Sequence, residues 1–163
     1  MASGPRAPII REMTERQKQL IVATDGSPGA REALEEGLGL AREAGAAVTL
    51  VYVRQKPPAV LGDLFYQRSL SQELLRARAV LADAVSLAAE QGIETDFEVL
   101  EGDPARAVLD LARARQADLI VVGSRGRGMV AGALLGSVSS SIVRDADRPV
   151  LVVKQRSRAR RAA

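Results

Sequence analysis

The chain has 163 residues, of which 47% are hydrophobic and 26% charged, and it contains no cysteine and no histidine. This length suits one domain with one core, and the composition excludes a disulfide scaffold, thiolate chemistry and a disordered chain. The formal net charge of +3 comes from the ends of the chain. Residues 1–18 carry four basic and two acidic side chains and residues 154–163 carry five basic and none acidic, so that Gln19–Val153 carries −4.

Nothing in the sequence predicts a membrane segment or export. The longest apolar run, Ala46–Val53, is too short to cross a bilayer. Residues 1–14 contain no apolar stretch of the kind found in a signal peptide. Together with the absence of cysteine, these features predict a cytoplasmic protein.

The charge distribution also predicts the domain organisation. We expect residues 1–17 to form a flexible N-terminal arm, residues 18–155 the folded domain, and residues 156–163 a basic C-terminal tail that is solvated. Two tyrosines and two phenylalanines are too few for a base-stacking surface, which argues against nucleic acid as a partner.

Short β-branched runs alternate with longer amphipathic patterns, which is typical of βαβ units and a parallel sheet. In chain order the pattern predicts a strand at Leu20–Ala23, a helix from Ser27 to Gly45, a strand at Val48–Val53, a helix from about Leu70 to Gln91, a strand at Glu94–Leu100, a helix opened by Asp103 and Pro104, a strand at Leu119–Val122, a helix from about Leu134 to Asp145, and a strand at Pro149–Val153.

Two helix starts and one connection are informative in this pattern. Ser27 before Pro28 and Asp103 before Pro104 each combine an N-capping side chain with a proline at the first helical position. The connection Arg54–Ser69 is long for a βα unit. It has two interpretations: a lid or interaction segment, or a loop folded back on the core. The stripe expected to bury the second helix consists of Leu70, Leu74, Ala77, Leu81, Ala84 and Ala88.

Right-handed crossovers restrict five such strands to a few doubly wound orders. In the order 3-2-1-4-5, the sheet reverses direction between the first and fourth strands, and ligands bind at that point beyond the carboxyl ends of the strands. The loops Thr24–Ser27 and Gly123–Ser137 would then face one crevice.

The second of these loops is rich in glycine and carries two arginines, Arg125 and Arg127. Glycines let a backbone approach an anion closely, and Ser137 and Ser139 fall where the next helix begins and its amides favour negative charge. The alternative is a flexible connection with a capping serine. A Walker A motif is excluded because the lysines are Lys18, Lys56 and Lys154, none of them in the loop.

A dinucleotide fingerprint is matched at Gly126, Gly128 and Ala131. We reject it because too little chain follows for a second nucleotide-binding half.

The spacing Gly123-x-x-Gly126, nine residues, then Gly136-Ser137 resembles the ATP-binding signature of the universal stress protein family. Three further segments are similar to that family in the same order: Leu20–Ser27, Ala117–Ser124 and Asp147–Lys154. The resemblance covers roughly residues 18–155. It implies an α/β fold of the adenine nucleotide alpha hydrolase type, with a five-stranded parallel sheet in the order 3-2-1-4-5 and helices on both faces.

The resemblance also implies a nucleotide site. Ala23, Thr24 and Asp25 would contact base and ribose, and the Val53 backbone would bond adenine. Ribose and phosphates would be surrounded by Gly123, Arg125, Gly126, Arg127, Gly128, Gly136, Ser137, Val138 and Ser139. Arg125 and Tyr52 depart from the family, in which many members carry histidine there. Arg125 would strengthen a phosphate contact or favour a cyclic nucleotide.

Asp25 has two interpretations: it contacts a ribose hydroxyl or a magnesium ion, or it caps the turn into the first helix. We expect Gly136 to adopt a left-handed backbone at the phosphates.

The last strand, Val150–Val153, is an apolar edge, which predicts a homodimer through that edge. The resemblance implies the same dimer. The alternative is that the arm or tail covers the edge.

The resemblance implies a stress-response or signalling protein that binds ATP. We assign no catalytic residue, because histidine, cysteine and a loop lysine are missing. Asp25 with magnesium would support slow ATP hydrolysis at most. The alternatives are a cyclic-nucleotide (cAMP) binder, a slow ATPase or phosphotransferase using the same pocket, and a basic-tailed adaptor with an empty pocket.

Overall fold

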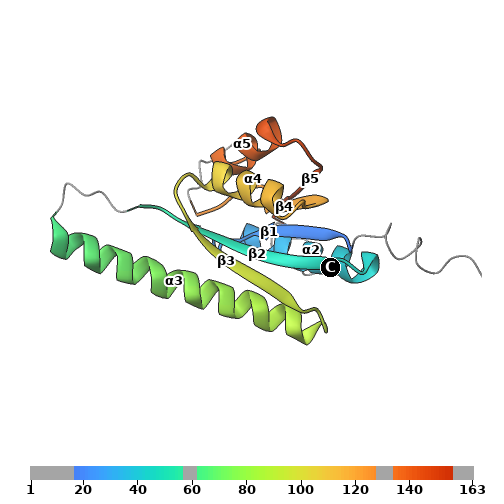
Figure 1. The fold of residues 1–163 in the computed structure, drawn as a ribbon, viewed down its shortest axis with the longest axis horizontal. Helices are drawn as coiled ribbons and strands as arrows, with labels where there is room; N and C mark the ends of the chain where they lie inside the picture. Colours follow the sequence, from blue (N-terminus) through green and yellow to red (C-terminus); the bar gives the residue numbers. More distant parts are fainter. Residues whose placement is uncertain (1–16, 57–61, 128–133, 156–163) are drawn as a thin grey trace, which may run out of the picture.

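Five parallel strands form one sheet in the order β3-β2-β1-β4-β5 in the computed structural model (Figure 1), which describes residues 17–56, 62–127 and 134–155. The strand order and the alternation of strands with helices agree with the sequence-based prediction. The elements are β1 Gln19–Ala23, α2 Pro28–Ala44, β2 Ala47–Arg54, α3 Asp63–Glu90, β3 Thr95–Glu101, α4 Pro104–Ala114, β4 Leu119–Gly123, α5 Ser137–Asp145 and β5 Val150–Val153. Of the arm expected at residues 1–17, residues 1–16 lie outside the described residues, as do the expected tail at 156–163 and Gly128.

The helices cover both faces of the sheet (Figure 1). On one face α2 and α3 pack against Val22, Leu50 and Tyr52. On the other face α4 and α5 pack against Ile21, Val51 and Ile120, and α5 contributes the buried apolar side chain of Ile142. Successive side chains of each central strand point to opposite faces of the sheet and therefore contribute to two separate apolar cores. In the described part of the chain, none of the helices has the length and apolarity needed to cross a bilayer.

The capping residues predicted from the sequence fix the starts of α2 and α4. Ser27 Oγ accepts a hydrogen bond from Ala30 N at 3.2 Å, and Asp103 Oδ1 accepts one from Arg106 N at 2.9 Å. A proline follows each cap, where a missing N–H costs nothing. Gly45 ends α2 in the left-handed conformation, with φ 60°.

The prediction for the Arg54–Ser69 connection was wrong in its second half. Helix α3 begins at Asp63 after Gly62, not near Leu70, because neither glycine nor proline interrupts residues 63–90. The predicted stripe is buried only from Ala77 onwards, and Leu74 is 46% exposed. The core reaches only the carboxyl-terminal half of α3, so the apolar periodicity of the first half did not report burial.

The start of α5 was also predicted too early. Gly136 is the N-cap with φ −73° and ψ 168°, and the helix begins at Ser137 instead of Leu134. Extended backbone at Gly136 stops the helix from beginning earlier. Ser137 and Ser139 therefore do lie in the first turn, as the sequence analysis expected.

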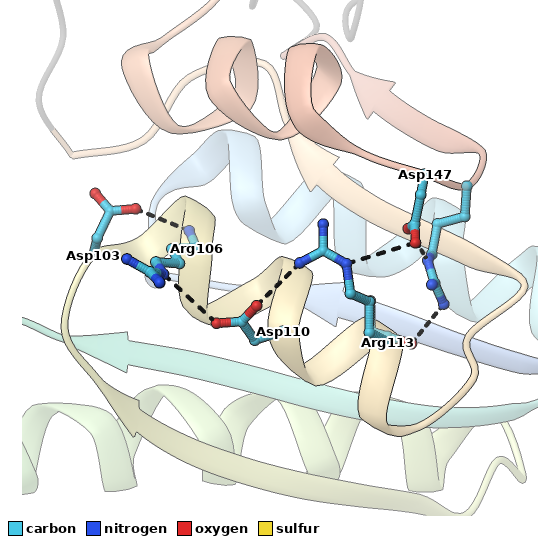
Figure 2. Close-up of polar contacts among 7 residues, drawn as sticks. Asp103, Arg106, Asp110, Arg113 and Asp147 are labelled. Atoms are coloured by element: carbon cyan, nitrogen blue, oxygen red, sulfur yellow. Dashed lines mark hydrogen bonds and ion pairs between the residues drawn. The ribbon is translucent and has the colours of Figure 1, made fainter.

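Arg148 ties the end of α4 to the segment before β5. Its Nη1 donates to the carbonyl oxygens of Ala112 and Ala117 at 2.6 and 3.0 Å, and its Nε donates to Asp147 Oδ1 at 2.8 Å. Figure 2 shows how Asp147 continues a series of polar contacts along α4 through Arg113. The Arg148 side chain is 16% exposed, so these contacts are partly shielded from water.

We expect Arg148→Ala to lower the free energy of unfolding by about 1.5–3 kcal/mol, the cost of losing a charged donor to buried carbonyls. The Arg148 hydrogen bond lowers the pKa of Asp147 to about 2. The contribution of the Arg148–Asp147 pair is therefore present above the ordinary pKa of 3.8 and is lost as the pH falls towards 2, whereas the bonds to the two carbonyls do not titrate. Urea unfolding at pH 7 and pH 3 checks both effects. An equal midpoint for the parent and Arg148→Ala at pH 7 would contradict this role.

Candidate functional site

The loops after β1 and β4 meet between these two neighbouring strands, at the point where the order of the strands in the sheet reverses. Thr24 N donates to Val51 O at 2.9 Å, which holds the turn after β1 against β2. Ser124 N donates to Val153 O at 2.7 Å, which holds the glycine-rich loop against β5. These two turns leave the carboxyl edge of the sheet side by side, and the N-terminus of α5 returns to the same edge through the hydrogen bond from Gly136 N to Ser124 O.

A cavity of about 280 Å³ lies at this point. Every site residue predicted from the sequence lines it, apart from Gly128, which lies outside the described residues. The lining residues are Ala23, Thr24, Asp25, Ala30, Val51, Val53, Gln55, Pro104, Val108, Val122, Gly123, Arg125, Gly126, Arg127, Gly136, Ser137, Val138 and Ser139. The loops therefore converge on one crevice, as the predicted strand order requires.

One wall of the cavity is apolar and the opposite end is polar. Val51, Val53 and Val108 form a wall between β2 and α4. Such a wall suits a flat, apolar group. At the other end lie the arginine-bearing loop and the first turn of α5. This division matches a ligand with one apolar and one anionic end.

The first turn of α5 lies at the polar end of the cavity. Among the described residues no side chain caps this helix, and the intrahelical ladder starts with the bond from Ser140 N to Gly136 O. The amides at the start of an uncapped helix favour negative charge. Ser139 lines the cavity, and its buried hydroxyl donates to neighbouring carbonyl oxygens, 3.0 Å from Ser124 O and 3.1 Å from Gly136 O. It therefore holds the glycine-rich loop to the helix.

Asp25 joins the two loops. Its Oδ1 accepts a hydrogen bond from Ser27 N, and its Oδ2 accepts one from Arg127 N, both at 2.9 Å. The first bond is the capping turn considered in the sequence analysis, and the second positions the glycine-rich loop. Asp25 is the carboxylate that lines the cavity, and magnesium is commonly held by one carboxylate with substrate phosphates. The described residues contain no group of three or more acidic, histidine or cysteine side chains that could hold a metal.

The glycines of the motif have different structural reasons. A Cβ on Gly126 would stand 2.6 Å from Asp25 Oδ2, so glycine allows the carboxylate to reach the loop. A Cβ on Gly123 would stand 2.8 Å from the Gly29 backbone. The expectation of a left-handed backbone at Gly136 was wrong: its φ is −73°, and the nearest atom of the described residues to a Cβ there would be Ser124 O, at 3.5 Å.

Arg127 and Tyr52 form a contact on the other face of the sheet. The Arg127 guanidinium carbon lies 5.9 Å from the centre of the Tyr52 ring. The ring is fully buried, and its hydroxyl donates to Glu73 Oε2 at 3.4 Å. Burial raises the pKa of Tyr52, and the nearby Arg127 charge opposes this rise. The prediction that Arg127 adds a phosphate donor thus meets a competing partner in this structure.

Sequence reasoning missed Gln55, Gly29 and Glu73. Gln55 follows β2 at the same sheet edge, a position that could have singled it out. Gly29 matters because a Cβ there would stand 2.8 Å from Arg125 O. Glu73 reaches Tyr52 only through the position of α3. Neither of these two contacts leaves a signal in the sequence.

The comparisons with known proteins agree on one family. The model of the universal stress protein family matches residues 17–154. A universal stress protein of Thermus aquaticus is 37% identical over 84% of this chain and 98% of its own length. Another, of Methanocaldococcus jannaschii, is 35% identical over 90% of this chain and 88% of its own.

Solved structures show the same fold. The universal stress protein UspA from Lactobacillus plantarum has a TM-score of 0.77 at 25% identity and covers 86% of this chain and 99% of its own. A universal stress protein solved in complex with cAMP has a TM-score of 0.65 at 26% identity, and the match covers 87% of this chain and 100% of that protein's chain. On the strength of the family match and these relatives, the chain belongs to the universal stress protein family.

Proposed function

We propose that this protein binds an adenine nucleotide, ATP with magnesium, in the cavity between β1, β4 and α5. The observation that carries the proposal is the convergence of an apolar wall, an uncapped helix N-terminus and an arginine-bearing glycine loop on one cavity of about 280 Å³. The base would lie against Val51, Val53 and Val108, with the phosphates at the loop and the first turn of α5.

Within this proposal, the site residues have distinct tasks. Ala23 and Thr24 contact base and ribose, and the amides of Ser137, Val138 and Ser139 meet the phosphates. Arg125 supplies a charged donor. Asp25 holds the loop and lies where it could also accept a magnesium ion or a ribose hydroxyl. When bound, magnesium would neutralise phosphate charge.

A cyclic nucleotide is the second candidate, because a family member of the same fold was solved with cAMP. Two features of this chain favour ATP. The glycine spacing fits the ATP-binding signature of the family, and the loop that lines the cavity carries two arginines, Arg125 and Arg127. One phosphodiester charge would use less of this donor set than a triphosphate would.

Mass spectrometry of ligand retained by the purified protein tests the proposal. The expected result is ATP or ADP released on denaturation, in up to one copy per protomer. Retained cAMP would select the second candidate. No retained nucleotide, combined with no binding of added ATP or cAMP, would reject nucleotide binding. The biological role that we propose is a cytoplasmic stress-response or signalling protein whose conformation depends on the bound nucleotide, with hydrolysis slow at most.

We further propose a homodimer through β5. This strand lies at one edge of the sheet, with β4 on its other side. Ile120 N donates to Pro149 O and Ser124 N to Val153 O. Because backbone groups alternate along a strand, the Val152 N–H points away from β4, towards the open edge. A second copy could pair with that edge.

Val152→Pro is expected to raise the dimer dissociation constant about tenfold or more. It removes an edge donor in each copy, at about 0.5–1.5 kcal/mol per hydrogen bond, while proline is tolerated on edge strands. Val152→Ala keeps the N–H and serves as the control. Light scattering over a dilution series measures both. A dimer equally stable in Val152→Pro and the parent would place the interface elsewhere.

A further inference from the structure

The Arg127 side chain contacts a residue that does not line the cavity. Its backbone N–H is held by Asp25 Oδ2, yet its guanidinium lies over the ring of Tyr52. Tyr52 belongs to the core formed with α2 and α3, whereas the apolar wall at Val51 belongs to the core formed with α4 and α5. Arg127 therefore lines the cavity, while its guanidinium lies over a ring that belongs to the core on the opposite face of the sheet.

The contact continues from Tyr52 into α3. The Tyr52 hydroxyl donates to Glu73 Oε2 at 3.4 Å, and the Glu73 side chain is only 27% exposed. A carboxylate that accepts from the hydroxyl makes the ring richer in electrons, which strengthens its attraction for a cation on its face. Arg76, 3.7 Å from Glu73, offsets part of this carboxylate charge. One aromatic ring thus has a cation over its face and an anion at its hydroxyl.

We propose that Tyr52 and Glu73 form an alternative binding position for the Arg127 guanidinium. Ligand phosphates and this Tyr52–Glu73 pair compete for the same guanidinium. The proposal rests on the proposed nucleotide binding. A ligand with phosphates beyond the first draws Arg127 from the ring, and this movement costs the cation–π contact. Glu73 is then a positioning residue that acts through Arg127. It weakens binding of ATP and leaves binding of AMP, which lacks the outer phosphates, unaffected.

Glu73→Gln tests this competition by removing one charge while keeping an acceptor for the Tyr52 hydroxyl. The expected result is an ATP affinity about two- to fivefold higher than in the parent, the range of one exposed or partly exposed charge interaction. AMP affinity stays at the parental value. A gain in affinity is informative because damage to the fold would cause a loss. Calorimetry with each nucleotide and magnesium gives both constants.

Glu90→Gln is the matched control for net charge. Glu90 is exposed at the carboxyl end of α3, 17 residues beyond Glu73 along the helix and thus about 25 Å away. It is expected to leave both affinities unchanged. Equal gains in Glu73→Gln and Glu90→Gln, or equal gains for ATP and AMP, would mean a general charge effect and would overturn the proposal.

The double variant Glu73→Gln with Arg127→Ala completes the cycle. Without the guanidinium there is nothing to compete for, so Glu73→Gln should have no effect in that background. A gain that persists in the Arg127→Ala background would overturn the proposal, as would ATP affinity unchanged or lowered by Glu73→Gln alone. A parent protein that binds neither ATP nor AMP would instead reject the proposed function itself.

Discussion

Replacing Gly126 by alanine is expected to weaken ATP binding at least tenfold. The new Cβ would stand 2.6 Å from Asp25 Oδ2, a distance at which the carboxylate must move. Asp25 would then lose its bonds to the amides of Arg127 and Ser27, each a charge-assisted contact worth about 1.5–3 kcal/mol. These bonds hold the loop in the conformation proposed to bind the nucleotide. Losing even one of them therefore lowers the affinity for ATP about tenfold.

A double-mutant cycle separates this cause from a general disturbance of the loop. In an Asp25→Ala background the carboxylate is gone, so Gly126→Ala has nothing to displace. We therefore expect Gly126→Ala to weaken binding little further in that background, although Asp25→Ala alone weakens it. Calorimetry on the four proteins gives the coupling energy. Additive losses would show that Gly126 acts independently of Asp25.

Gly123→Ala is expected to lower the free energy of unfolding by about 1–3 kcal/mol, the usual cost of overpacking. Its Cβ would stand 2.8 Å from the carbonyl carbon and oxygen of Gly29 and 3.0 Å from Ala30 N. These neighbours are backbone atoms in the first turn of α2, so no side chain can swing aside. The clash would separate the end of β4 from α2, and chemical denaturation measures its cost.

Gly39→Ala is the matched control for Gly123→Ala. Gly39 lies inside α2, and a Cβ there would meet nothing within 4 Å. Alanine at such a helical position is expected to raise the free energy of unfolding by about 0.4–1 kcal/mol, because it restricts the unfolded chain. The two substitutions should thus have opposite signs. A Gly123→Ala protein as stable as the parent would contradict the close contact between β4 and α2.

The sequence predicted the elements that local chemistry defines. Ser27 with Pro28 and Asp103 with Pro104 marked the starts of α2 and α4, because a capping oxygen and a proline act within one turn. The start of α3 was missed for a physical reason. Residues such as Leu74 follow the helical period without reaching the core, so periodicity alone could not distinguish packed from exposed turns.

The candidate site was predicted as a set of residues, but not as a set of contacts. The glycine spacing located the cavity because the motif is local. The bond between Asp25 and Arg127 joins residues 102 positions apart, and the bond between Tyr52 and Glu73 depends on where α3 crosses the sheet. Such distances arise from tertiary packing. They explain Gly126 by the approach of a side chain, where the sequence analysis proposed only phosphate.

Calorimetric titration of the parent protein with ATP and magnesium tests the central claim most directly. Nucleotide binding at the cavity predicts saturable binding of one ATP per protomer, weakened at least tenfold by Gly126→Ala in a protein that remains folded. Absence of binding by ATP and cAMP at millimolar concentration would contradict the claim. Unchanged affinity in folded Gly126→Ala would separate the nucleotide from the loop on which the assignment depends.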